Sequence, residues 1–432
     1  MSPDGRAVML EWLGAIPLAL WLEQAGYEGV LHLGVALQQN ASRWALYDRQ
    51  NSKLDNTIAP YFQIATKTGI WIQSGEQVLA NQHGTTLFSG ASLTKIATTL
   101  AALQRWSPDR QFITTIGATS PIVDGVVQGD LVVVGGGDPL LVWLEAIAIG
   151  QTLNQHGITG ATGDLIITGE LAINYQSDPL AVGALFYRSI NSDRWNSYVE
   201  QQYQNLPHQL PRPKVAIAGQ IRVRGTSPTM TPLLRHKSLP LTAILKRMNV
   251  YSHNRLSQQI TDFLGGTEAV RAAAVGLAGI PDGEVQLVNG SGLGVENRLS
   301  PRASVMLLMA IQRYLQMYHM SLADVFPIVG TDIGTLIDRS PPTGSIVKTG
   351  TLSVVSALSG AIFTRDRGLV WFSIINSGWD IEGFRIQQDE LLGQLAQYWG
   401  GVASPPDIMR SSDRWESAFL TLGSLSRNEI LR

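Results

Sequence analysis

Three short strings carry side chains whose types and spacing suit an acyl transfer. In chain order they are S-L-T-K at 92–95, S-H-N at 252–254 and K-T-G at 348–350. A serine hydroxyl is a weak nucleophile near neutral pH and needs a neighbouring base. Lys95 follows Ser92 by about one helical turn, which places both side chains on one helical face. A lysine buried among cationic and polar groups has a lowered pKa, so its neutral amine can accept the serine proton.

The S-H-N string lies between two helical patterns, at 241–248 and 254–263, where a loop can project its outer side chains. In this interpretation the hydroxyl of Ser252 relays a proton to a leaving amine, and the amide of Asn254 holds a substrate carbonyl. His253 points the other way, and we give it no catalytic role. The structural alternative is a loop that only caps the following helix.

The K-T-G string lies in an apolar strand that the sequence predicts over 345–352. A lone lysine in such a strand often protects a sheet edge from aggregation, which is the structural alternative for Lys348. Gly350 instead indicates a point where the backbone approaches a ligand closely. Thr349 and Thr351 fall on one face of the strand and offer two hydroxyls to a terminal carboxylate.

Taken singly, each string is weak evidence. A chance S-x-x-K is expected about once in a chain of this length, and Ser92 alone could be an ordinary helix N-cap. The chain also contains decoys: K-T-G at 67–69, S-I-N at 189–191 and S-R-N at 426–428. The first K-T-G precedes the nucleophile and is explained as a turn that enters a strand. The ordered set is stronger because it supplies a nucleophile, a base and an anion-binding strand, and a helix N-terminus at Ser92 suits a developing oxyanion.

The elements that must position these strings come from both ends of the chain. Hydrophobic periodicity predicts a helix from 92 to 105, another that begins at Ser300 and Pro301, and a last one at 385–398. Predicted strands flank them at 69–73, 77–80, 345–352, 357–364 and 369–376. Strands before and after a long helical middle predict one sheet built from both chain ends.

The sequence pattern changes between about residues 116 and 230. The strings G-D-L-V-V at 129–133 and G-D-L-I-I at 163–167 each resemble a turn that enters a strand, and a helical pattern lies between them at 142–155. We interpret 116–230 as an inserted accessory domain. The remaining domain, at 51–115 and 231–400, is then discontinuous. The polar tail at 401–432 is expected to be loose.

Composition narrows the class of protein. A chain of 432 residues favours two domains, and 44% apolar with 15% charged residues is typical of a well-buried globular protein. A net charge of −2 argues against a nucleic-acid partner. The absence of cysteine excludes disulfides, thiolate zinc sites and a cysteine nucleophile. None of the seven histidines forms an H-E-x-x-H string, so we expect no metal and no cofactor.

The first 50 residues contain an apolar run at 12–22. It could be the hydrophobic part of an export signal or a membrane-proximal anchor, although Arg6 before it is offset by Asp4. It is shorter than the roughly 20 residues that a spanning helix needs. An ordinary buried helix remains the alternative.

Together these strings resemble the D-alanyl-D-alanine carboxypeptidase/endopeptidase family, the low-molecular-mass class C penicillin-binding proteins. The resemblance covers about 65–400 and extends to G-D-L at 129–131, G-G-G-D-P at 135–139, G-D-L at 163–165, N-G-S-G-L at 289–293 and D-I-G-T-L at 332–336 with Arg339. The chain departs from the family at His253 and Asn289, where aspartate is usual. Its insert is also short, which implies that one of two usual accessory domains is missing or minimal.

The resemblance implies an α/β (α+β) fold: a penicillin-binding, β-lactamase-like transpeptidase domain, with an antiparallel sheet flanked by helices, and a smaller inserted α/β-type domain. It implies a serine-type D-Ala-D-Ala carboxypeptidase/endopeptidase that acts on peptidoglycan stem peptides in the periplasm or cell envelope. β-Lactam antibiotics would form an ester at Ser92 that hydrolyses slowly.

The family pattern also implies a role for each matched residue. Ser92 would attack the carbonyl between two D-alanines, Lys95 would take its proton, and Ser252 would complete the catalytic set. The backbone N–H groups of Ser92 and Thr351 would form the oxyanion hole. Substrate binding would fall to Asn254, Lys348, Thr349, Gly350 and Thr351.

Two other functions remain open on this scaffold. A β-lactamase or esterase needs an efficient deacylating group, and the sequence offers no clear glutamate motif, only Tyr251 beside Ser252. The lifetime of the acyl-enzyme would distinguish it from a peptidase. A non-catalytic peptidoglycan-binding or protein-binding module is the second alternative, against which the intact set of three strings argues.

Overall fold

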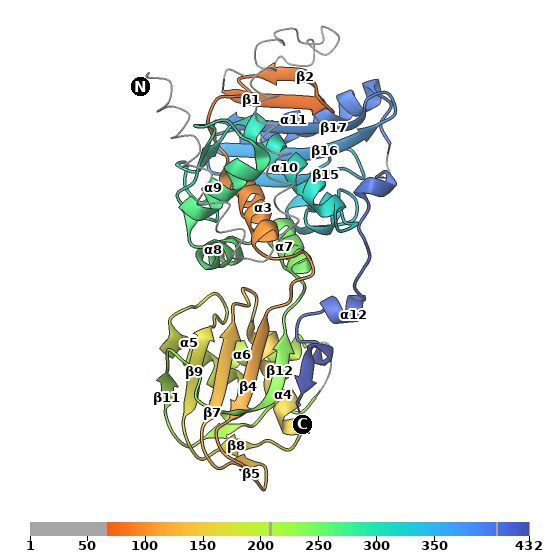
Figure 1. The fold of residues 1–432 in the computed structure, drawn as a ribbon. Helices are drawn as coiled ribbons and strands as arrows, with labels where there is room; N and C mark the ends of the chain where they lie inside the picture. The colour runs from red at the N-terminus through yellow and green to blue at the C-terminus, as the bar shows by residue number, and fades with distance from the viewer. Residues whose placement is uncertain (1–66, 207–209, 403–404, 432) are drawn as a thin grey trace, which may run out of the picture.

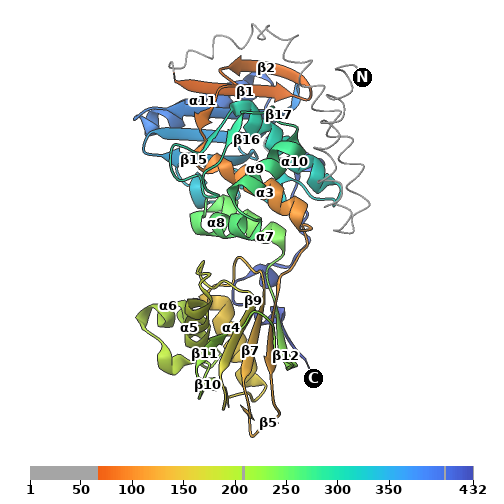
Figure 2. The same cartoon turned by 60° about the vertical axis from the view of Figure 1, so that its left-hand side comes forward.

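The computed structural model describes residues 67–206, 210–402 and 405–431. The apolar run at 12–22, with its interpretation as a signal or anchor, lies outside the described residues. Figures 1 and 2 show two bodies, an upper one with the central sheet and a lower one with a second sheet. The chain passes from the upper body to the lower one after α3 (Lys95–Arg105), returns before α7 (Leu241–Val250), and descends again near its C-terminus (Figure 1).

An antiparallel five-stranded sheet in the order β15-β16-β17-β1-β2 forms the centre of the upper body. The strands are β1 (Thr68–Ser74), β2 (Gln77–Gln82), β15 (Ile346–Leu352), β16 (Val355–Thr364) and β17 (Gly368–Ser377). Every residue of β16 is buried, because helices cover both faces of the sheet (Figure 1). One sheet built from segments distant in sequence is the arrangement that the sequence predicted.

Successive side chains of β1 point to opposite faces of the sheet and pack into different cores. Ile70 and Ile72 share a core with Leu391 and Leu392 of α11 (Ile381–Tyr398). Trp71 points to the opposite face and joins the larger helical core. That core contains the helices α3, α7, α8 (Asn254–Phe263), α9 (Thr267–Ala278) and α10 (Pro301–Gln316).

Short elements connect these layers. Strand β3 (Phe88–Ser89) comes just before the 3₁₀ turn η2 (Ala91–Thr94) and forms a small sheet with β14 (Arg298–Leu299) and β13 (Val285–Gln286), in the order β13-β14-β3. The turns η4 (Leu322–Asp324) and η5 (Gly334–Leu336) follow α10. The helix predicted to begin at Ser92 therefore opens as a 3₁₀ turn and becomes α-helical only at Lys95. Ser300 caps α10 by accepting from Ala303 N–H, as its S-P start indicates.

The lower body has its own sheet and its own core. Its six strands run in the order β11-β9-β7-β4-β12-β18, and a smaller sheet has the order β10-β8-β6-β5. The large sheet uses β4 (Ile113–Ala118), β7 (Leu131–Gly136), β9 (Leu165–Glu170), β11 (Ile221–Val223), β12 (Thr231–Lys237) and β18 (Asn428–Ile430). The small one uses β5 (Ile122–Val123), β6 (Val126–Val127), β8 (Gly160–Ala161) and β10 (Ala216–Ile217). Its helical elements are α4 (Trp143–Gln155), α5 (Pro179–Ile190), η3 (Ser192–Arg194) and α6 (Ser197–Gln204).

These bounds extend the predicted insert by a few residues at each end. The sheet already contains β4 from Ile113 and still contains β12 up to Lys237, whereas 116–230 was predicted. Both flanking strands pair with each other, since Thr115 lies opposite Arg235. The two strands that carry the chain into and out of the lower body are therefore part of its sheet.

The C-terminal segment differs from the loose tail that its polar composition predicted. After η6 (Asp407–Met409), α12 (Ser417–Leu420) and η7 (Leu425–Arg427), β18 adds to the sheet edge along β12. Arg427 is almost fully buried and donates to Glu145 of α4. A buried ion pair and a strand pairing hold this segment, and neither is visible in local composition because both partners are distant in sequence.

Within the described residues, no helix is long and apolar enough to cross a membrane. The same part of the chain contains no group of three or more histidine, cysteine or acidic side chains arranged to hold a metal ion.

Candidate active site

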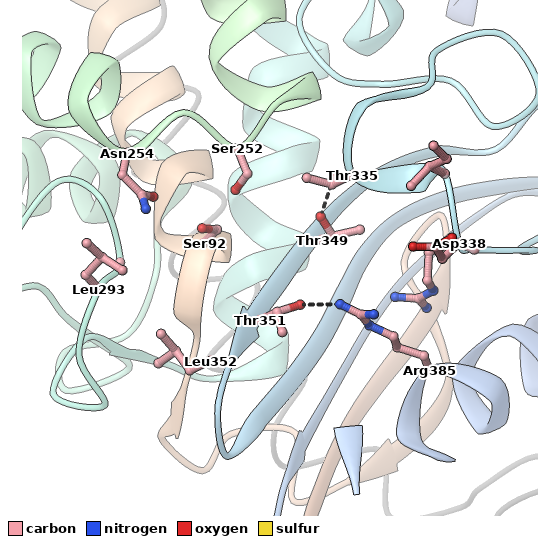
Figure 3. A pocket seen from close by; sticks show the side chains of 13 residues that line it. Ser92, Ser252, Asn254, Leu293, Thr335, Asp338, Thr349, Thr351, Leu352 and Arg385 are labelled. Atoms are coloured by element: carbon pink, nitrogen blue, oxygen red, sulfur yellow. Dashed lines mark hydrogen bonds between the residues drawn. The ribbon is translucent and has the colours of Figure 1, made fainter. Parts of the chain in front are cut away.

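The three predicted strings meet at one pocket of about 340 Å³ in the upper body (Figure 3). Residues that the sequence singled out form much of its lining: Ser92, Ser252, Asn254, Thr349 and Thr351. Lys95 and Lys348 are fully buried behind this wall, and the Nζ of each reaches a lining serine. The strings therefore converge as a set, although 253 residues separate Lys95 from Lys348 in sequence (348 − 95 = 253).

Close backbone approach places Ser92 at the pocket. Ala91 has φ +46°, which turns the chain sharply as η2 begins. A Cβ added to Gly350 would lie 2.7 Å from the carbonyl oxygen of Gly90, so only glycine lets β15 pack this closely against η2. A Cβ on Gly292 would lie 2.1 Å from the carbonyl oxygen of Ala91. Two glycines thus hold the serine turn between a strand and a loop.

Lys95 is in direct contact with Ser92. Its Nζ lies 2.9 Å from Ser92 Oγ and 2.8 Å from Asn254 Oδ1, and it also donates to the carbonyl oxygen of Ser291. No acidic side chain is among these partners, so nothing offsets the cost of burying a charged amine. Burial lowers the pKa of Lys95 from 10.5 to about 7. Near neutral pH a large share of the amine is therefore neutral and can accept the proton of Ser92.

Ser252 and Asn254 are placed by a tight turn between α7 and α8. Ser252 has φ +49°, a left-handed conformation that is uncommon for a residue with a Cβ. Its side chain faces the pocket, as does that of Asn254 (Figure 3). His253 instead caps α8, with its Nδ1 accepting from Leu256 N–H at 3.1 Å. The loop therefore caps a helix and also lines the pocket, so the two interpretations of this string are compatible.

An aromatic side chain of the inserted segment contacts this turn. Tyr175, in the connection between β9 and α5, packs against His253 with ring centroids 4.7 Å apart and ring planes tilted by 43°. Burial lowers the pKa of His253, which favours the neutral ring that its capping bond requires. The residue between Ser252 and Asn254 thus anchors the turn from outside the pocket.

Lys348 faces Ser252 from the sheet. Its Nζ donates to Ser252 Oγ at 3.1 Å and to the carbonyl oxygen of Thr349 at 2.8 Å. Burial, with a smaller contribution from the charge of Lys95, lowers the pKa of Lys348 well below its usual value. Lys348 and Ser252 therefore form a second amine–hydroxyl pair beside the first.

Strand β15 is the edge of its sheet and presents backbone groups toward the pocket. Val347 N–H donates to Pro327 O at 3.0 Å, away from the neighbouring strand β16. Because N–H groups alternate in direction along a strand, those of Thr349 and Thr351 point the same way as Val347. The hydroxyl of Thr349 donates to Thr335 Oγ1 at 2.8 Å.

The sequence did not single out two features of this pocket. Thr335 belongs to the D-I-G-T-L string, which carried a resemblance but no assigned role. Arg385 of α11 lines the pocket and donates to Thr351 Oγ1 at 3.3 Å (Figure 3). No local signal could have identified Arg385, because a surface arginine in a helix is ordinary and only tertiary packing brings it to β15.

The side chain of Asn289 fixes the loop at 289–293 through three hydrogen bonds. Its Oδ1 accepts from the backbone N–H groups of Ser291 and Gly292 at 3.1 and 2.8 Å, and from Ser291 Oγ at 2.8 Å. An amide oxygen can accept these bonds as a carboxylate oxygen would. These bonds hold the loop that presents the Ser291 carbonyl oxygen to Lys95 Nζ.

Comparison with known proteins identifies the family. Residues 50–177 and 190–398 match the model of the D-Ala-D-Ala carboxypeptidase 3 (S13) family. The chain is 25% identical over 393 residues to the D-alanyl-D-alanine carboxypeptidase DacB of Haemophilus influenzae, which covers 68% of this chain and 81% of that protein. The chain therefore belongs to the D-Ala-D-Ala carboxypeptidase 3 (S13) family, and it is a hydrolase of the serine-type D-Ala-D-Ala carboxypeptidase class.

Solved structures share the fold at lower identity. The penicillin G-acylated endopeptidase Bd3459 of Bdellovibrio bacteriovorus, in complex with immunity protein Bd3460, superposes with a TM-score of 0.69 at 21% identity, over 84% of this chain and 99% of that one. Penicillin-binding protein 4 of Haemophilus influenzae, in complex with a β-lactam, gives 0.60 at 19% identity, over 80% and 99%. These likenesses confirm the predicted fold class.

Proposed function

We propose that this protein hydrolyses the D-Ala-D-Ala bond of peptidoglycan stem peptides through an acyl-enzyme at Ser92, and that β-lactams inhibit it by acylating the same serine. The observation that carries the proposal is the Ser92–Lys95 pair. A hydroxyl lies 2.9 Å from an amine whose pKa is lowered to about 7. A base with this pKa is suited to proton transfer at neutral pH.

The proposed acylation uses each group once. Ser92 Oγ attacks the carbonyl carbon between the two D-alanines while its proton passes to Lys95 Nζ. The backbone N–H groups of Ser92 and Thr351 hold the developing oxyanion. The C–N bond then breaks as the proton held by Lys95 passes through the hydroxyl of Ser252 to the leaving amine, and terminal D-alanine departs. The amide of Asn254 holds the peptide in place through a backbone carbonyl.

Deacylation completes the cycle. Water attacks the ester carbonyl, the shortened peptide leaves as a carboxylate, and the hydroxyl of Ser92 is regenerated. A β-lactam would follow the first half only, because its leaving amine stays tethered to the acyl group. A β-lactamase would need a group that speeds this last step. Tyr251, which the sequence offered for that role, lines a separate hollow rather than this pocket.

The proposed substrate implies a location. Peptidoglycan lies outside the cytoplasmic membrane, so this activity would be exercised in the periplasm or cell envelope. The domain division belongs to the same proposal: the upper body carries the chemistry, and the insert supports the S-H-N turn through Tyr175.

Release of D-alanine from defined muropeptides tests the proposal. Wild-type protein should convert pentapeptides to tetrapeptides, or cleave cross-linked dimers, and chromatography separates the two products. Ser92→Ala should abolish both reactions, whereas Ser426→Ala, from the decoy S-R-N string, should change neither. Turnover that survives in Ser92→Ala would contradict the acyl-enzyme at that residue.

A further inference from the structure

The pocket must accept a substrate that ends in a negative charge. The free α-carboxylate of the terminal D-alanine needs hydrogen-bond donors, and a cation if it is to be bound tightly. The motif lysine is the obvious choice from sequence. Its position excludes it, because Lys348 is fully buried, absent from the pocket lining, and already donates to Ser252 and to the carbonyl of Thr349.

Two arginines line the pocket among the described residues, and they differ in availability. Arg339 is held by a buried ion pair, and its side chain is 3% exposed. Its guanidinium group donates to both carboxylate oxygens of Asp389 and to the side-chain oxygen of Gln388. To turn toward a ligand it would have to leave Asp389 as an unpaired carboxylate, which is costly. Arg339 therefore supports the wall of the pocket.

Arg385 is free to exchange its partner. Its side chain is 26% exposed, and its carboxylate partner Glu382, one turn earlier in α11, is 73% exposed. A solvent-exposed pair of this kind contributes little free energy, so an incoming carboxylate can replace Glu382 at small cost. The planar guanidinium group of Arg385 can bind a carboxylate with two N–H groups.

A hydrogen bond to β15 holds the guanidinium group of Arg385 beside Thr351. Its Nη2 donates to Thr351 Oγ1 at 3.3 Å, on the pocket side of the strand (Figure 3). Since that hydroxyl oxygen accepts from the arginine, its own proton remains to be donated to a ligand. A carboxylate beside Thr351 would therefore meet one hydroxyl donor and one cation.

We propose that Arg385 is a specificity-determining residue that binds the free α-carboxylate of the leaving amino acid, together with Thr351. The inference rests on the proposed function and adds to it the basis for preferring substrates with a free carboxylate on the leaving group. Lys348 then acts on Ser252, and the charge of the substrate is met by a residue outside the three motif strings. Binding of the carboxylate draws Arg385 away from Glu382.

Two thioesters that differ only in the leaving group test this assignment. The N-benzoyl-D-alanyl thioester of thioglycolate carries a carboxylate on its leaving group, whereas the N-benzoyl-D-alanyl thioester of 2-mercaptoethanol carries none. The rate of thiol release measures the hydrolysis of each thioester. We expect Arg385→Gln to lower kcat/KM for the charged thioester roughly ten- to hundredfold, mainly through KM. Turnover of the neutral thioester should stay unchanged, and Arg385→Lys should restore part of the loss.

Arg271→Gln is the matched control. Arg271 forms the same i, i+3 pair with Glu268 on α9, with exposures of 32% and 75%, but does not line the pocket. It should leave both substrates unaffected. Equal losses on both thioesters in Arg385→Gln, or no loss on either, would overturn the proposal. Turnover by Ser92→Ala would instead contradict the proposed function, so the two failures are distinguishable.

Discussion

Replacing Asn254 with aspartate tests the assignment of Lys95 as the base. Asn254 Oδ1 lies 2.8 Å from Lys95 Nζ, so Asn254→Asp puts a negative charge beside the amine at almost constant volume. At an effective dielectric constant of about 20, opposite charges at this distance attract by about 6 kcal/mol. This energy sets an upper limit of about four units on the rise in the pKa of Lys95. Observed shifts from a neighbouring opposite charge are about one to three units.

The pKa of Lys95 should therefore rise from about 7 to about 8–10. The neutral amine would fall from about half of the molecules at pH 7 to between about 10% and 0.1%, a loss of about 5- to 500-fold. The sign follows from the role of the base: acylation requires the deprotonated amine, so activity lost at pH 7 returns as the pH rises. The fold should tolerate the change, because an acidic residue is favourable in the first turn of α8.

The assay is the second-order rate constant of acylation by a fluorescent penicillin, measured from pH 5.5 to 9.5. Wild-type protein should show a rising limb with a midpoint near 7, and Asn254→Asp should move that midpoint upward. Loss of the Asn254 amide lowers the plateau at every pH, so the midpoint and not the amplitude is decisive. Asn196→Asp, the same change at the N-cap of α6, should leave the profile unchanged. A midpoint that stays near 7 in Asn254→Asp would refute the assignment.

Three further substitutions test how the site and fold are held. Gly350→Ala places a Cβ 2.7 Å from the carbonyl oxygen of Gly90, at the start of η2. We expect the rate of acylation to fall more than tenfold and the free energy of unfolding to fall by about 1–3 kcal/mol. A normal rate of acylation would contradict this account. Tyr175→Ala removes the ring that packs against His253, a contact of about 0.5–1.5 kcal/mol, and should slow acylation severalfold without moving the pH midpoint. Arg427→Met leaves Glu145 buried without a cation and should lower the free energy of unfolding by about 3–5 kcal/mol in denaturant titration; a change below about 1 kcal/mol would show that the pair is not stabilising.

Elements with strong local patterns were predictable from the sequence. The predicted strands at 357–364 and 369–376 correspond to β16 (Val355–Thr364) and β17 (Gly368–Ser377), because long apolar runs bounded by turn residues leave few alternatives. The three strings are also recognisable from the sequence, since their order and spacing are encoded along the chain. Their meeting at one pocket follows from a sheet that joins both chain ends.

Features that depend on distant partners could not be predicted. Asn428 bonds to His236, 192 residues earlier, and this pairing orders a segment whose composition is that of a loose tail. Arg385 acquires its place at the pocket only because α11 packs on the sheet beside β15. The helix at Ser92 opens as a 3₁₀ turn that lies close to Gly350 of β15, a long-range contact that helix propensity does not encode.

Intact-mass spectrometry after incubation with benzylpenicillin tests the central claim most directly. The wild-type chain should gain the mass of one penicilloyl group and keep it for minutes or longer, and peptide mapping should locate that group on Ser92. Ser92→Ala should gain nothing. An adduct that disappears within seconds would identify a β-lactamase, and a wild-type chain that forms no adduct would contradict an acyl-enzyme mechanism at this pocket.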